Sequence, residues 1–154
     1  MEIKNIDKKK LLGNIETIID KNLPIMSNLA NLSRLFMDTF ADTLWSGFYL
    51  CDEKCEYLYL GPYQGPLACV KIPFGKGVCG KVVEFKKTIL VPNVHEFPGH
   101  IACSSLSNSE IVVPIIKNDK VVGVIDLDSA LFNNYSEEDQ KLLEDASNII
   151  SELF

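Results

Sequence analysis

The chain has 154 residues, of which 47% are hydrophobic and 23% charged, and its formal net charge at pH 7 is -6. This length and composition are typical of one globular domain with its own core. The negative charge, with no basic cluster beyond the three lysines at positions 8 to 10, disfavours a nucleic-acid partner, because binding to phosphates requires concentrated positive charge.

The N-terminal segment lacks the apolar stretch of a secretion signal, and no apolar run approaches the ~20 residues that span a bilayer. We therefore expect a cytoplasmic protein without membrane contact. The chain contains five cysteines, an odd number: Cys51, Cys55, Cys69, Cys79 and Cys103. Without a secretion signal, such a set disfavours a static disulfide framework and favours redox, catalytic or metal-binding roles.

The first 40 residues have the periodicity of two amphipathic helices. Ile6, Leu11 and Ile15 begin one apolar stripe, which predicts an N-terminal helix within residues 1–20. A second stripe starts after Pro24 and ends at Phe40. Short aromatic and β-branched runs at 44–51, 56–61 and 67–73 then predict strands, because they alternate with turn-forming residues.

The second half of the chain continues this α+β pattern. The stretch "GVCGKVVEF" has helical spacing, "TILV" predicts a brief strand, and a long loop follows from Pro92 to about Asn108. Two apolar runs around "KNDK" predict a central antiparallel hairpin, with a bulge or an edge at Pro114. Ser136, followed by Asp139, begins a C-terminal helix over 136–153.

Three of the cysteines and one histidine allow a zinc site, a redox centre or separately buried thiols. They are Cys69, Cys79, His100 and Cys103, spaced C-x9-C-x20-H-x2-C. Zinc is disfavoured because structural zinc sites usually contain paired C-x2-4-C ligands. The redox interpretation is favoured because each cysteine lies in its own polar or glycine-rich setting. Cys79, near a helix start beside Lys76, is expected to be a thiolate.

Carboxylates provide a second candidate site. Asp126 and Asp128 are two residues apart on a predicted strand, so both project from one face, and a ligand ammonium group would relieve their repulsion. The alternative is that both are solvated at a strand end. Glu110 would face Leu127 if residues 116 and 121 pair in a regular hairpin; a bulge at Pro114 or a longer loop would pair it with Asp126.

The strand "WSGFYL" places Trp45, Gly47 and Tyr49 on one face. The glycine would leave a gap between two rings, and aromatic walls around a gap suit a thioether or a sulfoxide, although strand aromatics more often belong to the core.

Several long motifs together resemble the GAF-domain free methionine-(R)-sulfoxide reductases, from about Leu29 to the C-terminal helix. These motifs are "WSGFYL", "GPYQGPLAC", "IPFGKGVCG", "VPNVHEFPGHIACSSLSNSEIVVPI" and "GVIDLDS". The resemblance implies one GAF domain over residues 1–154, with a mainly antiparallel six-stranded sheet between helical layers. The departures are Ser104 and Ser105, where the family more usually has Asp-Ala, and the additional cysteines Cys51 and Cys55.

By position, the resemblance implies that Cys103 is the nucleophile, Cys69 the usual resolving thiol and Cys79 a second redox thiol. It assigns substrate recognition to Trp45, Tyr49, Glu110, Asp126 and Asp128. The implied reaction reduces free methionine-(R)-S-oxide to methionine through a sulfenic acid and an intramolecular disulfide, which thioredoxin reduces. No cofactor or metal is implied, and a homodimer is a family expectation. Such an enzyme would act in repair after oxidative stress.

The chemistry is consistent with these residue types. A thiolate attacks a sulfoxide sulfur only if the departing oxygen is protonated, so a neutral carboxylic acid, Glu110 or one of the aspartates, is needed as donor. The loop from Pro92 to Asn108 could act as a lid that excludes peptides. Two rivals are a GAF module that senses a ligand without turnover and a zinc-dependent structural protein; the absence of a fused output domain in this chain disfavours the first.

Overall fold

An antiparallel sheet of six strands forms the centre of the structure, a computed structural model that describes residues 6–154. The strand order is β3-β2-β1-β6-β5-β4, and every neighbouring pair is antiparallel. The strands are β1 (Thr43–Cys51), β2 (Tyr57–Gln64), β3 (Lys71–Pro73), β4 (Ile89–Val91), β5 (Ser109–Lys117) and β6 (Lys120–Ser129). The predicted α+β class with a six-stranded sheet is confirmed.

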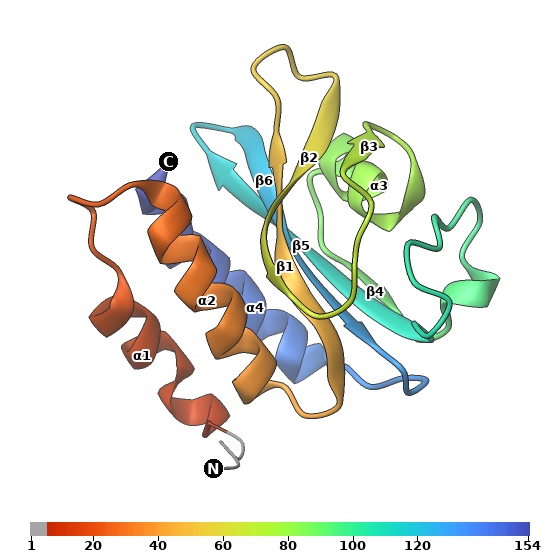
Figure 1. The fold of residues 1–154 in the computed structure, drawn as a ribbon, viewed down its shortest axis with the longest axis horizontal. Coiled ribbons are helices and arrows are strands. Elements are labelled where there is room, and N and C mark those ends of the chain that lie inside the picture. The colour runs from red at the N-terminus through yellow and green to blue at the C-terminus, as the bar shows by residue number, and fades with distance from the viewer. Residues whose placement is uncertain (1–5) are drawn as a thin grey trace.

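Helices cover both faces of the sheet, as Figure 1 shows. On one face lie α1 (Leu11–Ile18), α2 (Ile25–Thr39) and α4 (Glu137–Ile150). The other face carries α3 (Gly77–Phe85). Two apolar cores result: a larger one beneath the three helices, and a smaller one between α3 and the sheet. The long helices are stabilised mainly by this burial of their apolar stripes.

The ends of the helices differ in how well the sequence specifies them. Helix α4 begins with a capping box, in which the Ser136 hydroxyl accepts from the Asp139 amide and the Asp139 carboxylate accepts from the Ser136 amide. The predicted N-terminal helix over 1–20 is too long: within the described residues a 3-10 turn at Lys8–Lys10 leads into α1, which ends at Ile18. Residues 1–5 of that prediction lie outside the described part of the chain.

The hairpin of β5 and β6 contains a bulge that sets the orientation of Glu110. Ile116 pairs with Val121 across the two-residue turn, but Ile115 pairs with Gly123, so Val122 is an extra residue on β6. Glu110 therefore lies opposite Asp128, where a regular hairpin would have placed it opposite Leu127. The predicted irregularity is confirmed. Its predicted position and the predicted pairing with Asp126 are wrong, because the bulge lies on β6 beside the turn.

Within residues 6–154, no helix is both long enough and apolar enough to cross a membrane.

Alternation along β6 sends Leu127 into the larger core while Asp126 and Asp128 face the other way. We expect Leu127→Ala to lower the free energy of unfolding by about 2–5 kcal/mol, because the side chain is fully buried and its removal leaves a cavity. Urea unfolding measures the change. Leu131→Ala, at a side chain that is 50% exposed, is the control and should change stability by less than about 0.5 kcal/mol. Equal losses in the two variants would contradict this assignment of faces.

Candidate active site

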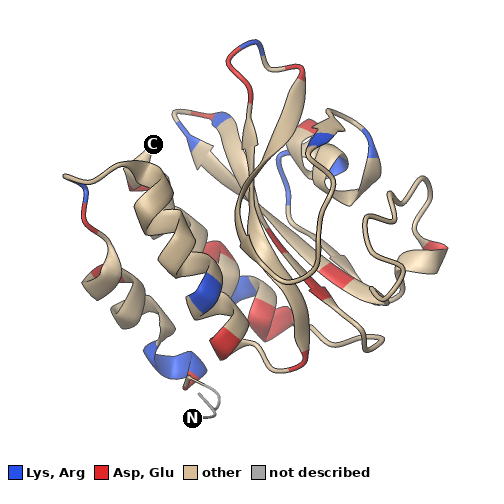
Figure 2. Ribbon diagram, in the orientation of Figure 1, with Lys and Arg blue, Asp and Glu red and all other residues tan. Residues whose placement is uncertain are grey.

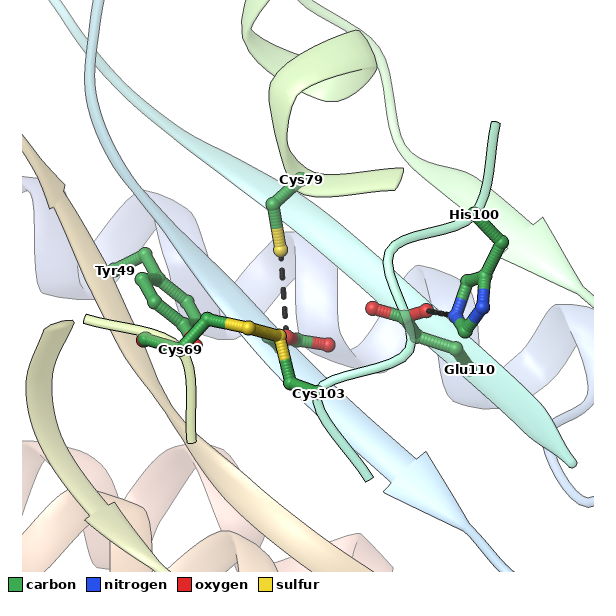
Figure 3. Close-up of a disulfide and its surroundings, with 7 residues drawn as sticks. Tyr49, Cys69, Cys79, His100, Cys103 and Glu110 are labelled. Atoms are coloured by element: carbon green, nitrogen blue, oxygen red, sulfur yellow. Dashed lines mark hydrogen bonds and ion pairs between the residues drawn. A yellow bond between two sulfur atoms is a disulfide. The ribbon is translucent and has the colours of Figure 1, made fainter. Parts of the chain in front are cut away.

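A pocket lies between the sheet, the start of α3 and the loop that precedes β5. Five of the six expected carboxyl and thiol groups line it, four of them from helices and strands: Cys79 from α3, Glu110 from β5, and Asp126 and Asp128 from β6. Cys103, on the loop, also lines it, together with Trp45 and Tyr49 from β1. Cys69 is bonded to Cys103 at its edge (Figure 3). The structure thus brings together, at one pocket, every residue that the sequence suggested as catalytic or substrate-binding.

A disulfide joins Cys69 to Cys103 across 34 residues, with their Cα atoms 5.5 Å apart. Cys69 lies just before β3, slightly outside the strand that the sequence predicted for it. The Tyr49 hydroxyl donates a hydrogen bond of 2.9 Å to the Cys69 carbonyl oxygen, which holds this end of the disulfide against β1. In this state neither sulfur can act as a thiolate ligand, so the zinc arrangement suggested by the spacing is not formed.

Cys79 is buried, and its thiol donates to Asp126 Oδ2 over 3.3 Å. Burial, reinforced by Asp126 and Glu110, raises the pKa of this thiol well above its usual value. The expectation that Cys79 is a thiolate is therefore wrong for this structure. The N-terminus of a nine-residue helix does not outweigh the loss of hydration beside two carboxyl groups.

The three carboxyl groups share one face, and no lysine or arginine of residues 6–154 pairs with them. Glu110 and Asp126 are each 5% exposed, and Asp128 is partly buried. Figure 2 shows acidic positions side by side on β5 and β6, while the lysines of these strands, Lys117 and Lys120, lie at the turn end of the hairpin. Burial first, and the neighbouring carboxyl groups second, raise the pKa of all three well above the usual values. Asp126 Oδ1 is buried without a hydrogen-bond partner.

Two loop residues contact this acidic face: His100, which the sequence suggested only as a possible zinc ligand or neighbour of Cys103, and Ser107, which it did not single out. The His100 Nε2 atom lies 3.4 Å from Glu110 Oε2, and Ser107 donates to Asp128 Oδ1 over 2.7 Å. Burial lowers the pKa of His100 below its ordinary value. A signal was available in both cases, because each is a polar residue within four positions of Cys103 or Glu110.

The aromatic residues pack differently from the expected gap. Trp45 stacks on Tyr49 with ring centroids 5.8 Å apart and on Tyr63 at 5.2 Å. A Cβ atom on Gly47 would lie 2.8 Å from the Trp45 ring, so that ring covers the glycine. The expected vacancy between the two rings is therefore filled, and the rings form one wall of the pocket.

One group in residues 6–154 could supply three metal ligands: Cys79, Glu110 and Asp126, whose nearest donor atoms lie within 4.8 Å of one another. Burial and the neighbouring carboxyl groups raise the pKa of each group and so favour its protonated form while no cation is bound, whereas metal ligation requires deprotonated sulfur and oxygen. Without a cation, the arrangement is suited to donating a proton.

The other two cysteines lie away from the pocket, around the turn between β1 and β2. Cys55 is exposed, and Cys51 is half-buried at the end of β1. Burial is the main cause that raises the pKa of Cys51 to about 12. Their interpretation as incidental thiols stays a prediction.

Comparison with known proteins gives consistent matches. The GAF domain family matches residues 27–154. A protein of Escherichia coli K12 named free methionine-R-sulfoxide reductase is 44% identical over 116 residues, which cover 75% of this chain and 69% of the relative. Two solved structures superpose with a TM-score of 0.90 and 40% identity. One is the free methionine-R-sulfoxide reductase of Neisseria meningitidis with its substrate, covering 96% of this chain and 87% of that one. The other is the reduced Staphylococcus aureus fRMsr, covering 99% of both.

The acidic face makes stability depend on pH. A carboxyl group whose pKa is raised by folding stabilises the protein fully below its unfolded pKa, and this contribution is lost as the pH rises toward the folded pKa. Asp126→Asn removes one such group. We therefore expect its free energy of unfolding, relative to the parent, to increase between about pH 5 and about pH 8, by at most ~1.4 kcal/mol per pH unit. Urea unfolding across this range measures the difference.

Glu53→Gln, in the exposed turn after β1, is the matched control and should run parallel to the parent at every pH. A parallel curve for Asp126→Asn as well would show that Asp126 is ionised in the folded protein.

Proposed function

Because this chain belongs to the GAF-domain family of free methionine-(R)-sulfoxide reductases, we propose that it reduces free methionine-(R)-S-oxide to methionine by thiol chemistry, with a dithiol protein such as thioredoxin as the final reductant. The E. coli relative is named for this activity, and the Neisseria structure is described as a complex with substrate. The R stereochemistry comes from these relatives.

One observation carries the proposal: the disulfide sulfur of Cys103 and three carboxyl groups with raised pKa values open onto one pocket. Sulfoxide reduction needs a sulfur nucleophile on one side of the substrate sulfur and an acid that protonates the departing oxygen. A carboxylic acid is protonated at neutral pH only where burial or like charges raise its pKa, which is the situation of Glu110, Asp126 and Asp128.

In the first step, the Cys103 thiolate attacks the substrate sulfur while a carboxyl group protonates the oxygen. Methionine leaves, and Cys103 keeps the oxygen as a sulfenic acid. Glu110 is the proposed donor because it is buried at the centre of the acidic face, between Asp128 and His100. The proton released when Cys103 ionises balances the one that the donor delivers.

In the second step, a resolving thiol attacks the sulfenic acid, which releases water and forms a disulfide. The Cys69–Cys103 bond supports Cys69 as this thiol. Cys79 is the proposed second redox thiol, and its raised pKa makes it the slower of the two nucleophiles. An external dithiol then exchanges with the disulfide and restores both thiols.

Recognition of a free amino acid follows from the acidic face. The substrate ammonium group would supply the positive charge that Asp126 and Asp128 lack within the described residues, and ionisation of the aspartates would then become favourable. Trp45 and Tyr49 form the wall against which the thioether chain would pack. The homodimer and the cytoplasmic location stay predictions from the sequence.

The substrate prediction can be tested with reduced protein, thioredoxin and thioredoxin reductase, by following NADPH consumption. We expect turnover of the free R epimer, and rates at least about 100-fold lower with the S epimer and with a peptide-bound sulfoxide, because neither places the ammonium group and the sulfoxide oxygen in the pocket together. Activity limited to the peptide substrate, or none with any sulfoxide, would refute the proposed function.

Cysteine variants test the order of the thiol steps. With thioredoxin and thioredoxin reductase present, we expect Cys103→Ser to release no methionine, and Cys69→Ser to release a first methionine like the parent and then to cycle more slowly, because its sulfenic acid lacks the main resolving thiol. Cys55→Ser is the matched control, at an exposed cysteine outside the pocket, and should turn over like the parent. Normal cycling by Cys69→Ser would transfer the resolving role to Cys79.

A further inference from the structure

Within residues 6–154, His100 is the only basic side chain in contact with the acidic face, and its Nε2 atom lies 3.4 Å from Glu110 Oε2. The carboxyl group of Glu110 is deeply buried, while the side chain of His100 retains 13% exposure. In Figure 3 the imidazole lies on the far side of Glu110 from Cys79. The histidine therefore lies between the buried acid and the protein surface.

The proposed chemistry requires such a position. Each time Glu110 protonates the sulfoxide oxygen, it is left as a carboxylate in a buried site beside Asp126 and Asp128. The matching proton left Cys103 and went to solvent when the thiolate formed. A second cycle requires that a proton return to Glu110 from solvent, and a carboxyl group at 5% exposure exchanges poorly with water by itself.

We propose that His100 carries this proton, taking it from water at one ring nitrogen and passing it to Glu110 from Nε2. The proposal rests on the proposed reductase function, in which Glu110 is the donor. Imidazole suits the task because its two nitrogens can accept and donate in turn, which leaves the ring neutral after each cycle. In this role His100 acts on the substrate only through Glu110, so it is a proton-transfer residue, although its side chain also lines the pocket.

The other groups that face Glu110 are less suited to this role. Tyr49 on β1, Cys79 on α3 and Asp126 on β6 are at most 5% exposed. Asp128 on β6 is only partly buried, but it is an acid of the same face whose pKa burial raises, and its carboxyl group accepts a hydrogen bond from Ser107. The lowered pKa of His100, which burial causes, keeps its ring neutral at physiological pH and therefore able to accept a proton.

The test distinguishes two roles of His100: returning a proton to Glu110 and merely anchoring the loop. His100→Gln retains a donor toward Glu110 but cannot relay a proton. With pre-reduced protein and saturating dithiothreitol, we expect it to release the first methionine at the parent rate, because Glu110 starts protonated, and then to cycle about 10–100-fold more slowly with KM within about threefold. Imidazole in the buffer should restore cycling to His100→Ala, whose missing ring leaves room for it.

His95→Gln is the matched control, since His95 is the only other histidine in the chain and is exposed on the same loop; it should cycle like the parent and gain nothing from imidazole. Thermal unfolding verifies that every variant is folded. Parent-like cycling by His100→Gln, a slowed first turnover, or no response of His100→Ala to imidazole would each overturn the proposal. Absence of turnover in the parent would instead refute the reductase function itself.

Discussion

The structure depends on a buried acidic face that has no lysine or arginine to neutralise it in residues 6–154. Glu110, Asp126 and Asp128 project from neighbouring strands into one pocket. Burial and mutual repulsion raise the pKa of all three carboxyl groups, so their neutral forms are favoured until a cation arrives. The same constraint supplies both properties that a sulfoxide reductase needs: an acid at neutral pH and a site that favours an ammonium ion.

A single extra residue produces this face. Without Val122, the regular pairing of β5 and β6 would turn Glu110 toward the larger core, opposite Leu127. With it, Glu110 and Asp128 are cross-strand partners on the pocket side. The bulge lies beside the turn, far along the strands from the carboxyl groups, and the register shift passes through five regular pairs before it reaches Glu110. The chemistry of the site is therefore determined partly by a local irregularity at the other end of the hairpin.

Sequence patterns specified the fold well and the site in part. Helical and alternating apolar periods located the α2, α3 and α4 helices and the central hairpin, because core burial imposes those periods directly. The resemblance to a known family nominated the pocket residues. Three features were beyond sequence reasoning: the position of the bulge, the buried neutral thiol of Cys79, and the tryptophan ring over Gly47. Each depends on how segments that are distant in sequence pack together. A local preference, the helix dipole at Cys79, therefore predicted a thiolate where burial beside two carboxyl groups favours the neutral thiol.

The loop before β5 is tied to the pocket by the same side chains that are proposed to react. Between Phe97 and Asn108, the contacts of the described loop side chains with other elements include the Cys69–Cys103 bond, His100 on Glu110 and Ser107 on Asp128. Reduction removes the covalent tie and leaves polar contacts: His100 and Ser107 contact carboxyl groups whose protonation would change during the proposed cycle, and Asn108 donates to the Ala130 carbonyl oxygen. The oxidation state of the cysteines is therefore coupled to how the loop is attached. In the oxidised protein the Cys69–Cys103 disulfide holds the loop. In the reduced protein the loop is held through its contacts with carboxyl groups, which a bound ammonium ion would ionise. Cys103 must reach the substrate, Cys69 and an external dithiol in turn. Its thiol thus lies on a segment whose attachment changes during the proposed cycle.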